Sequence, residues 1–423
     1  MSKKDDILAK ITEFYLRSRD FNGLPVENIL EDPTLESDEL KNIIVSLIRK
    51  NKISLNFGDA HPNPHIKAFK EEPEEKQIEK LQRSNLESVC AYPSTSHLKE
   101  AVDPSKYQDR PFTLRLVLGE PQLCFQAFAL TVLEFYRNDP RYYYTNSDIS
   151  GTISARDQSF KSGEKPSPDE VLLQSFGFCY DSKLNRAVAV FLRYLSDLSP
   201  EHQQIWNAKI LKGDYKLHPD YFRPSVLGEW PEGVSIFDAF TQELHHINEI
   251  SKLMHRPPLF KNELTEDNKP RGFCFLIRPT LKEYNDFVHL LDKATSENIN
   301  RKFFLNDLPF TYEEIRDNGK VVVHQKGTIQ ILDEWLRLKF QAKDQKPIEE
   351  MFATFKKVRK LRQRPAHTIN YDVFDQKYLK QQRELIKKAY GAIRLLRLIF
   401  ANHPNAKEYK IPDCLQSGKI WTY

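Results

Sequence analysis

The sequence lacks long apolar runs. None approaches the roughly 20 consecutive residues that a membrane-spanning helix needs, so we expect no membrane contact. The first ten residues, MSKKDDILAK, are charged and contain no apolar stretch, which predicts that no secretory signal is present. Together these absences indicate a cytoplasmic protein.

Cysteine is also scarce, with five in 423 residues. The cysteines are odd in number, far apart in the sequence and never arranged as a CxxC pair: Cys90, Cys124, Cys179, Cys274 and Cys414. This pattern argues against a zinc site or a disulfide framework, and it favours buried thiols in a reducing cytoplasm.

Several common catalytic motifs are missing. The sequence contains no GxGxxG, Walker-type P-loop, HExxH or GxSxG segment, so it does not support ATP-driven or common hydrolase chemistry, and we expect no cofactor. A helix over 238–254 carries Glu243, His246 and Glu249 on one face. Polar residues at a spacing of three are routine on exposed helix faces, so we predict no metal site there.

The composition predicts a globular protein. Hydrophobic residues make up 40% of the chain and aromatic residues 12%, and 423 residues suffice for two to four domains. Helical periodicity prevails, with a few short strand patterns between the helices. We therefore predict a mainly α fold of the α+β type with several domains.

The first 70 residues predict three helices followed by two strands. Helical spacing covers 5–19, 26–30 and a segment that begins near Ser37, and the strands are expected at 53–57 and 66–69. Three helices followed by a β-hairpin resemble a winged helix-turn-helix domain, which implies either a DNA-binding or a protein-contacting role.

The third helix of this domain leaves both roles open. DNA binding requires cations that neutralise phosphates and side chains that read base edges. The exposed face offers such groups but also two acids: Lys41, Asn42, Arg49 and Lys50 against Asp38 and Glu39.

Three further regions follow the first 70 residues. We predict a charged linker and loop at 71–110, a mostly helical central domain of unpredicted role at 111–300, and a helical domain at 301–423. Within the first of these regions, residues 70–87 fit either a linker or a solvated helix. Helices are expected at 125–137 and 186–198, a strand at 149–154, a short strand or extended link at 320–325, and the last three helices at 328–341, 347–362 and about 375–401.

Basic charge is concentrated near the C-terminus. The net charge is only +4, but residues 356–397 contain thirteen lysines and arginines against three acids. Between the last two predicted helices, Arg362 and His367 form an Arg-x4-His motif, and Pro365 predicts a bend there.

This motif and its setting resemble the HEPN family (higher eukaryotes and prokaryotes nucleotide-binding), whose ribonuclease members carry Arg-x4-His at a bend between helices. The resemblance covers the last 100 to 140 residues. It implies an α-helical bundle, a metal-independent RNA endonuclease, a toxin or phage-defence role, and a homodimer that pairs two motifs across one cleft. Gln363 stands where the family usually has Asn, Asp or His, and it offers similar donor and acceptor groups.

The chemistry of RNA cleavage suits these two residue types. RNA supplies its own nucleophile, the 2′-hydroxyl beside the scissile phosphate. His367 can transfer the proton near neutral pH, and Arg362 can stabilise negative charge on the phosphate. Neighbouring residues are expected to hold the RNA backbone: Lys356, Lys357, Lys360, Gln363, Arg364 and Lys380.

A non-catalytic role is the alternative. Some HEPN proteins are inactive scaffolds, and the winged-helix-like domain suits a nucleic-acid-binding regulator. The expected partners of the chain are RNA, a second copy of the chain, a further protein and, if the N-terminal domain binds nucleic acid, DNA.

Overall fold

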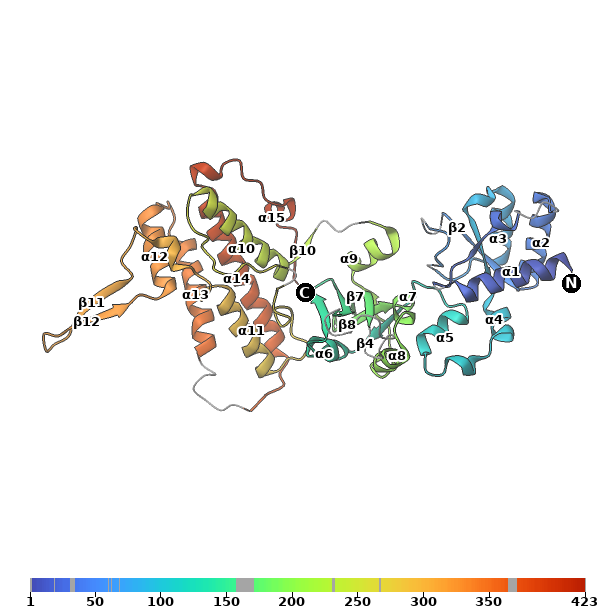
Figure 1. Ribbon diagram of the computed structural model, residues 1–423, viewed down its shortest axis with the longest axis horizontal. Coiled ribbons are helices and arrows are strands. Elements are labelled where there is room, and N and C mark those ends of the chain that lie inside the picture. The colour runs from blue at the N-terminus through green and yellow to red at the C-terminus, as the bar shows by residue number, and fades with distance from the viewer. Residues whose placement is uncertain are drawn as a thin grey trace. The chain divides into compact units, whose positions relative to one another are not determined.

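The computed structural model describes residues 2–18, 20–30, 35–59, 61, 63–67, 69–156, 171–229, 233–265, 268–363 and 371–422. The fold contains both helices and strands (Figure 1). About half of the residues lie in helices. The chain divides into two compact units, residues 1–144 with 149–231 and residues 145–148 with 232–423. None of the helices in the described ranges is long and apolar enough to cross a membrane.

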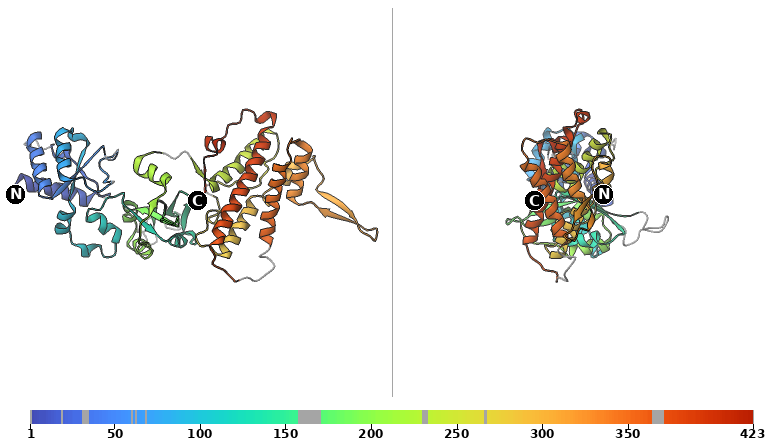
Figure 2. Two further views of the ribbon diagram at one scale, coloured as in Figure 1. Left: turned by 180° about the vertical axis from the view of Figure 1, so that it is seen from behind. Right: turned by 90° about the vertical axis from the view of Figure 1, so that its left-hand side faces the viewer.

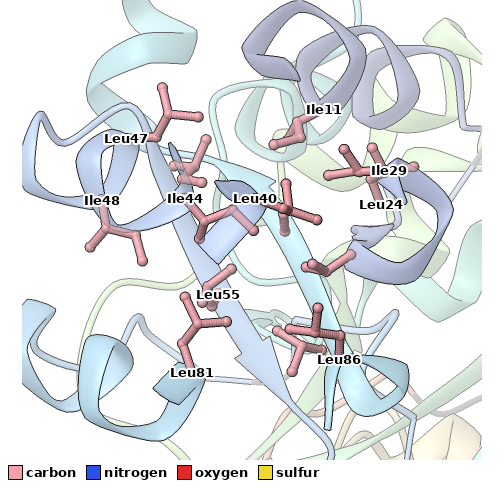
Figure 3. Close-up of a cluster of buried hydrophobic side chains, with 14 of the residues drawn as sticks. Ile11, Leu24, Ile29, Leu40, Ile44, Leu47, Ile48, Leu55, Leu81 and Leu86 are labelled. Carbon is pink, nitrogen blue, oxygen red and sulfur yellow. The ribbon is translucent and has the colours of Figure 1, made fainter. Parts of the chain in front are cut away.

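The N-terminal part of the first unit is built around a three-stranded antiparallel sheet in the order β1-β3-β2. Its elements are α1 (Lys3–Arg17), β1 (Leu24–Pro25), the 3-10 helix η1 (Val26–Ile29), α2 (Ser37–Arg49), β2 (Ile53–Phe57), α3 (Glu74–Arg83), η2 (Leu86–Ser88) and β3 (Val89–Pro93). Figure 3 shows the core, in which α1 contributes Ile11, α2 contributes Leu40 and Ile44, and β2 contributes Leu55.

Two predictions for this part were wrong. The strand that pairs with β2 is Val89–Pro93, not 66–69. The stretch 71–110 is not a linker and loop, because it contains α3, β3, α4 (Thr95–Ala101) and η3 (Pro104–Tyr107). Of the two alternatives for 70–87, a helix forms, but it is not merely solvated, because α3 buries Ile78 and Leu81 in the core of the sheet. Its apolar stripe is too short to stand out among the surrounding charges.

A buried glutamine fixes α3 to the sheet. Gln77 accepts a hydrogen bond from the backbone N–H of Leu55 at 2.8 Å and donates one to the carbonyl of Glu72 at 2.6 Å. Buried polar groups are stable when they are hydrogen-bonded in this way.

The rest of the first unit contains a six-stranded sheet in the order β4-β8-β7-β6-β5, with β9 paired to β7. The strands are β4 (Phe125–Phe128), β5 (Tyr142–Asn146), β6 (Ser150–Ala155), β7 (Leu172–Tyr180), β8 (Arg186–Phe191) and β9 (Lys216–Leu217). The helices are α5 (Pro111–Val117), α6 (Val132–Arg137), α7 (Leu192–Ser196), α8 (Pro200–Asn207), α9 (Pro219–Phe222) and the π-helical turn η5 (Arg223–Leu227).

The strand expected at 149–154 is confirmed as β6, but the helices expected at 125–137 and 186–198 were wrong. The first range contains β4 and α6, and the second contains β8 and α7. The residues of β8 from Ala187 to Phe191 are all buried. A strand buried on both faces is a continuous apolar run, and periodicity alone does not distinguish it from a buried helix.

The second unit is mainly helical. Its elements are β10 (Val234–Ser235), α10 (Ile236–Leu253), α11 (Leu281–Ala294), η6 (Arg301–Phe304), β11 (Thr311–Ile315), β12 (Val321–Gln325), α12 (Thr328–Lys339), α13 (Lys346–Gln363), α14 (Lys377–Ala401), η8 (Pro404–Ala406), α15 (Asp413–Ser417) and β13 (Ile420–Trp421). α14 packs against both α10 and α13, and α11 packs against α13. The antiparallel hairpin β11–β12 extends away from these helices (Figures 1 and 2).

The last three predicted helices are confirmed as α12, α13 and α14, and the short strand at 320–325 is confirmed as β12. The apolar stripe of α14 is buried throughout: Leu385, Ile386, Ala389, Ile393, Leu396 and Phe400. The second unit starts well before the domain boundary expected at residue 301, because α10 and α11 belong to the same group of helices as α13 and α14.

A glycine in β7 permits close packing in the first unit. A Cβ atom at Gly177 would collide with the ring of Tyr221, which is fully buried and stacks on Phe191 with ring centroids 5.4 Å apart. We predict that Gly177→Ala lowers the free energy of unfolding by about 1–3 kcal/mol, because this core has no room for an added methyl group. Thermal denaturation measures the effect.

Gly58→Ala is the matched control, because its nearest neighbour is a side-chain carbon of Ser88 at an ordinary 3.6 Å. Equal melting temperatures for the two variants would contradict the close packing at Gly177.

Candidate functional site

Arg362 lies in the last turn of α13 and faces the other helices of its unit. It continues the spacing of three buried residues of this helix, Met351, Phe355 and Val358. Its side chain is 29% exposed. The arginine of the motif therefore lies at the edge of the helical core and not on the outer face of α13.

Two carboxylates near the end of α11 hold this arginine. The Arg362 Nη1 atom lies 3.0 Å from Oδ2 of Asp292, and it also donates to a carboxylate oxygen of Glu297. The Glu297 side chain is 32% exposed, whereas the Asp292 side chain is completely buried. The two carboxylates therefore differ in their access to solvent.

Asp292 has a second arginine partner. Nε of Arg359 lies 3.1 Å from Oδ2 of Asp292, and Nη2 of Arg359 lies 3.1 Å from the hydroxyl of Ser296, which donates to Asp292. A buried carboxylate is costly unless it is paired and hydrogen-bonded, and here two guanidinium groups satisfy it. We call Arg359, Arg362, Asp292, Ser296 and Glu297 the arginine–carboxylate cluster.

The cluster favours the charged form of Arg362. Partial burial of the guanidinium acts to lower its pKa, but the hydrogen bonds to Asp292 and Glu297 outweigh this effect and raise the pKa of Arg362. Two arginines and two carboxylates also give the cluster no net formal charge.

The other predicted site residues near the motif are either outside the described residues or exposed. His367 and Arg364 lie outside the described residues, so the placement of His367 opposite Arg362 stays a prediction. Gln363, the last residue of α13, is exposed. Lys380 is exposed near the start of α14.

The structure does not bring the predicted lysines of α13 together with Arg362. Lys356, Lys357 and Lys360 are exposed, whereas Arg362 lies on the buried side of the same helix. Helical geometry places residues 357 and 362 well apart around the axis. These lysines therefore form an outer basic face that is separate from the arginine–carboxylate cluster.

A second line of cations runs along α14, and the sequence interpretation selected only its first residue, Lys380, as a site. Lys380, Arg383 and Lys387 follow each other at spacings of three and four, so they lie on one face, and all three are exposed. Among the described residues, no carboxylate pairs with them. We call them the α14 basic stripe, and their spacing was the signal that would have identified them.

The outer basic face of α13 and the α14 basic stripe both reach the same end of the second unit. α13 ends and α14 begins at the same end of their unit (Figure 1). Lys360 and Gln363 lie in the last turns of α13, and Lys380 and Arg383 lie in the first turns of α14.

The polar residues of α10 have protein partners. Glu243 is completely buried and forms an ion pair with Arg397 of α14, with Nε 2.5 Å from Oε2. His246 Nδ1 lies 2.8 Å from the hydroxyl of Tyr409. Glu249 instead groups with His245 and Glu263, whose candidate ligand atoms lie within 4.8 Å of one another. This group could hold a metal ion, but Glu249 also forms an ion pair with Lys252 at 2.5 Å.

On the N-terminal domain, α1 partly covers α2. Asn42 and Arg49 are exposed on α2, and so is Lys50, which directly follows the helix. Lys3 pairs with Glu39 at 2.9 Å, and Lys4 donates to the hydroxyl of Ser46 at 2.5 Å. The beginning of α1 therefore lies beside the face of α2 on which the predicted DNA contacts lie.

Comparison of the chain with family models, with curated proteins and with solved structures gave no match.

The buried carboxylate predicts a specific stability effect. Replacing both Arg359 and Arg362 by Gln leaves Asp292 without a charged partner, so we expect the free energy of unfolding to fall by about 3–5 kcal/mol. Adding Asp292→Asn removes the unpaired charge and should restore part of this loss. Urea denaturation of the unmodified chain, the double variant and the triple variant measures both steps.

The double variant Lys357→Gln with Lys360→Gln removes two cations from the outer face of the same helix, and it should change stability by less than about 0.5 kcal/mol. A large loss in this control, or no restoration by Asp292→Asn, would show that the buried carboxylate does not govern the effect.

Proposed function

We propose that this chain is a metal-independent RNA endonuclease of the HEPN type that cuts RNA with Arg362 and His367. The observation that carries the proposal is the position of Arg362: two carboxylates hold it at the end of α13, immediately before the segment that contains His367. An arginine in a fixed position can contact a phosphate without first losing much side-chain entropy.

In the proposed reaction, His367 removes the proton of the RNA 2′-hydroxyl, and the resulting oxygen attacks the adjacent phosphorus. The bond from phosphorus to the 5′-oxygen breaks, this oxygen takes a proton from water, and His367 returns its proton to the solvent. The products are a 2′,3′-cyclic phosphate end and a free 5′-hydroxyl end. Arg362 neutralises the charge that develops on the phosphate oxygens. Neither step requires a metal ion.

The carboxylates determine how RNA reaches Arg362. Glu297 is about one-third exposed, whereas Asp292 is buried. An incoming phosphate therefore displaces Glu297 and leaves Asp292 in contact with the guanidinium. In this proposal Asp292 positions the arginine, and Glu297 competes with the substrate.

The α14 basic stripe is the proposed path of the RNA backbone. Its cations are exposed and have no carboxylate partner among the described residues, so they can neutralise phosphates without breaking an ion pair. A homodimer that pairs two motifs, a toxin or phage-defence role, and a cytoplasmic location belong to the same proposal.

The N-terminal domain supports a second candidate function, a nucleic-acid-binding regulator. The order α1, β1, η1, α2, β2 and β3 resembles that of a winged helix-turn-helix domain, although α3 lies between β2 and β3 in this chain. The exposed Asn42, Arg49 and Lys50 would then contact DNA. Binding of duplex DNA without any RNA cleavage would favour this candidate.

The proposed chemistry predicts that His367→Ala abolishes RNA cleavage, because no other group is proposed to move the proton. Gel analysis of labelled RNA in excess EDTA should show cleavage by the unmodified chain and 2′,3′-cyclic phosphate ends. His324→Ala, which changes a half-exposed histidine of the β11–β12 hairpin, is the control and should remain active. Strict dependence on magnesium, or full activity of His367→Ala, would refute this site.

The α14 basic stripe predicts a change in salt dependence. Replacing Lys380, Arg383 or Lys387 singly by Gln should weaken RNA binding modestly and lower the slope of log affinity against log salt by about one unit. Fluorescence anisotropy at several salt concentrations measures this slope. Lys76→Gln, on the exposed face of α3, should leave it unchanged. Equal slopes for all four variants would exclude the stripe as the RNA path.

A further inference from the structure

A pocket of about 310 Å³ lies in the second unit beside the C-terminal half of α14. Its lining comes from α10, α14 and the segment that follows α14: Ile250, Arg394, Arg397, Leu398, Ala401, Ala406, Lys407, Tyr409, Ile411 and Gln416. This volume is at the lower end of the roughly 300–1,000 Å³ that is typical of small-molecule sites. None of the lining residues belongs to the arginine–carboxylate cluster.

The charged groups of this lining are all cations, namely Arg394, Arg397 and Lys407. Arg397 is 3% exposed and is neutralised by its ion pair with Glu243. Arg394 and Lys407 have no carboxylate partner among the described residues. The Nε atom of Arg394 is buried and has no hydrogen-bond partner in the described part of the chain. A buried donor without a partner is costly, so an acceptor from a ligand would stabilise it.

A hydrogen bond to the buried His246 holds Tyr409, one of the residues that line the pocket. His246 Nδ1 lies 2.8 Å from the hydroxyl of Tyr409. Burial lowers the pKa of His246 to about 4, and the nearby His245 and Arg397 act in the same direction. His246 is therefore neutral at pH 7, and its contact with Tyr409 is a hydrogen bond between uncharged groups.

The pocket also has an apolar part. Ile250, Leu398 and Ile411 contribute aliphatic side chains, and Tyr409 contributes a ring. The lining passes from exposed residues, Lys407 and Gln416, to the buried Arg397. A ligand that fills it needs an anionic group for the cations and an apolar or ring-bearing group for the remainder.

We propose that this pocket binds a small organic phosphate. Arg394 and Lys407 bind the phosphate oxygens, with the Nε–H of Arg394 as one donor, and the organic group packs against Tyr409 and the aliphatic side chains. Arginine forks suit phosphate oxygens better than a single point charge does. The site is independent of the proposed RNA cleavage, because it uses other residues and needs no catalytic step.

Isothermal titration calorimetry of the full chain tests this site with three probes: phenyl phosphate, inorganic phosphate and phenol. We expect phenyl phosphate to bind most tightly, inorganic phosphate at least tenfold more weakly, and phenol not at all. Equal affinity for phenyl phosphate and inorganic phosphate would overturn the proposed apolar contact. Absence of phenyl phosphate binding at millimolar concentration would overturn the site.

Two variants locate the binding. Arg394→Gln should weaken phenyl phosphate binding at least tenfold, and Lys407→Gln, which changes an exposed side chain, should also weaken it without affecting folding. Arg316→Gln is the matched control, because it removes an exposed arginine that lies outside the pocket and outside the α14 basic stripe. An equal loss in Arg316→Gln would show attraction to the general basic surface and would overturn the pocket.

Discussion

The second unit depends on buried carboxylates that are paired with arginines from neighbouring helices. Asp292 of α11 binds Arg359 and Arg362 of α13, and Glu243 of α10 binds Arg397 of α14. Removing one partner of such a pair leaves an uncompensated buried charge, so shifting a helix along its neighbour is costly. We infer that these pairs fix the register of the four long helices, while their apolar stripes provide most of the burial.

This constraint divides the basic residues of the C-terminal region into two groups. Arg359, Arg362 and Arg397 are held by carboxylates and contribute little net charge. The cations on the outer face of α13 and along the α14 basic stripe have no such partners among the described residues, so they determine the charge that a polyanion meets. An arginine of the first group acts on a substrate only if the substrate displaces a carboxylate, and Glu297 is the exposed one.

The helices of the second unit could be predicted because their apolar stripes are long and regular, as in α14. β8 could not be predicted, because a run of buried residues fits a strand and a helix equally well. The orientation of Arg362 was available in its spacing from Met351, Phe355 and Val358. The carboxylate partners of Arg362 could not be predicted from the sequence. Asp292 lies 70 positions away from Arg362, and only the packing of α11 against α13 brings these two residues together.

The arginine motif could therefore be found in the sequence, but its electrostatic state could not. A motif defines residue types and their spacing, whereas the charge that a phosphate meets depends on the packing of distant helices. The same holds for the pocket beside α14, whose cations come from α14 and from the segment after it. Neither arrangement has a local sequence signal.

In the proposed function, Glu297 competes with RNA for the guanidinium of Arg362. The most direct measurement compares RNA affinity and cleavage rate of the unmodified chain with those of Glu297→Gln, using Glu313→Gln on the exposed hairpin as the control. We expect tighter RNA binding and faster cleavage for Glu297→Gln, because the competing charge is removed, and no change for Glu313→Gln. Unchanged binding and cleavage in Glu297→Gln would contradict it, because Arg362 would then not be the group that the RNA contacts.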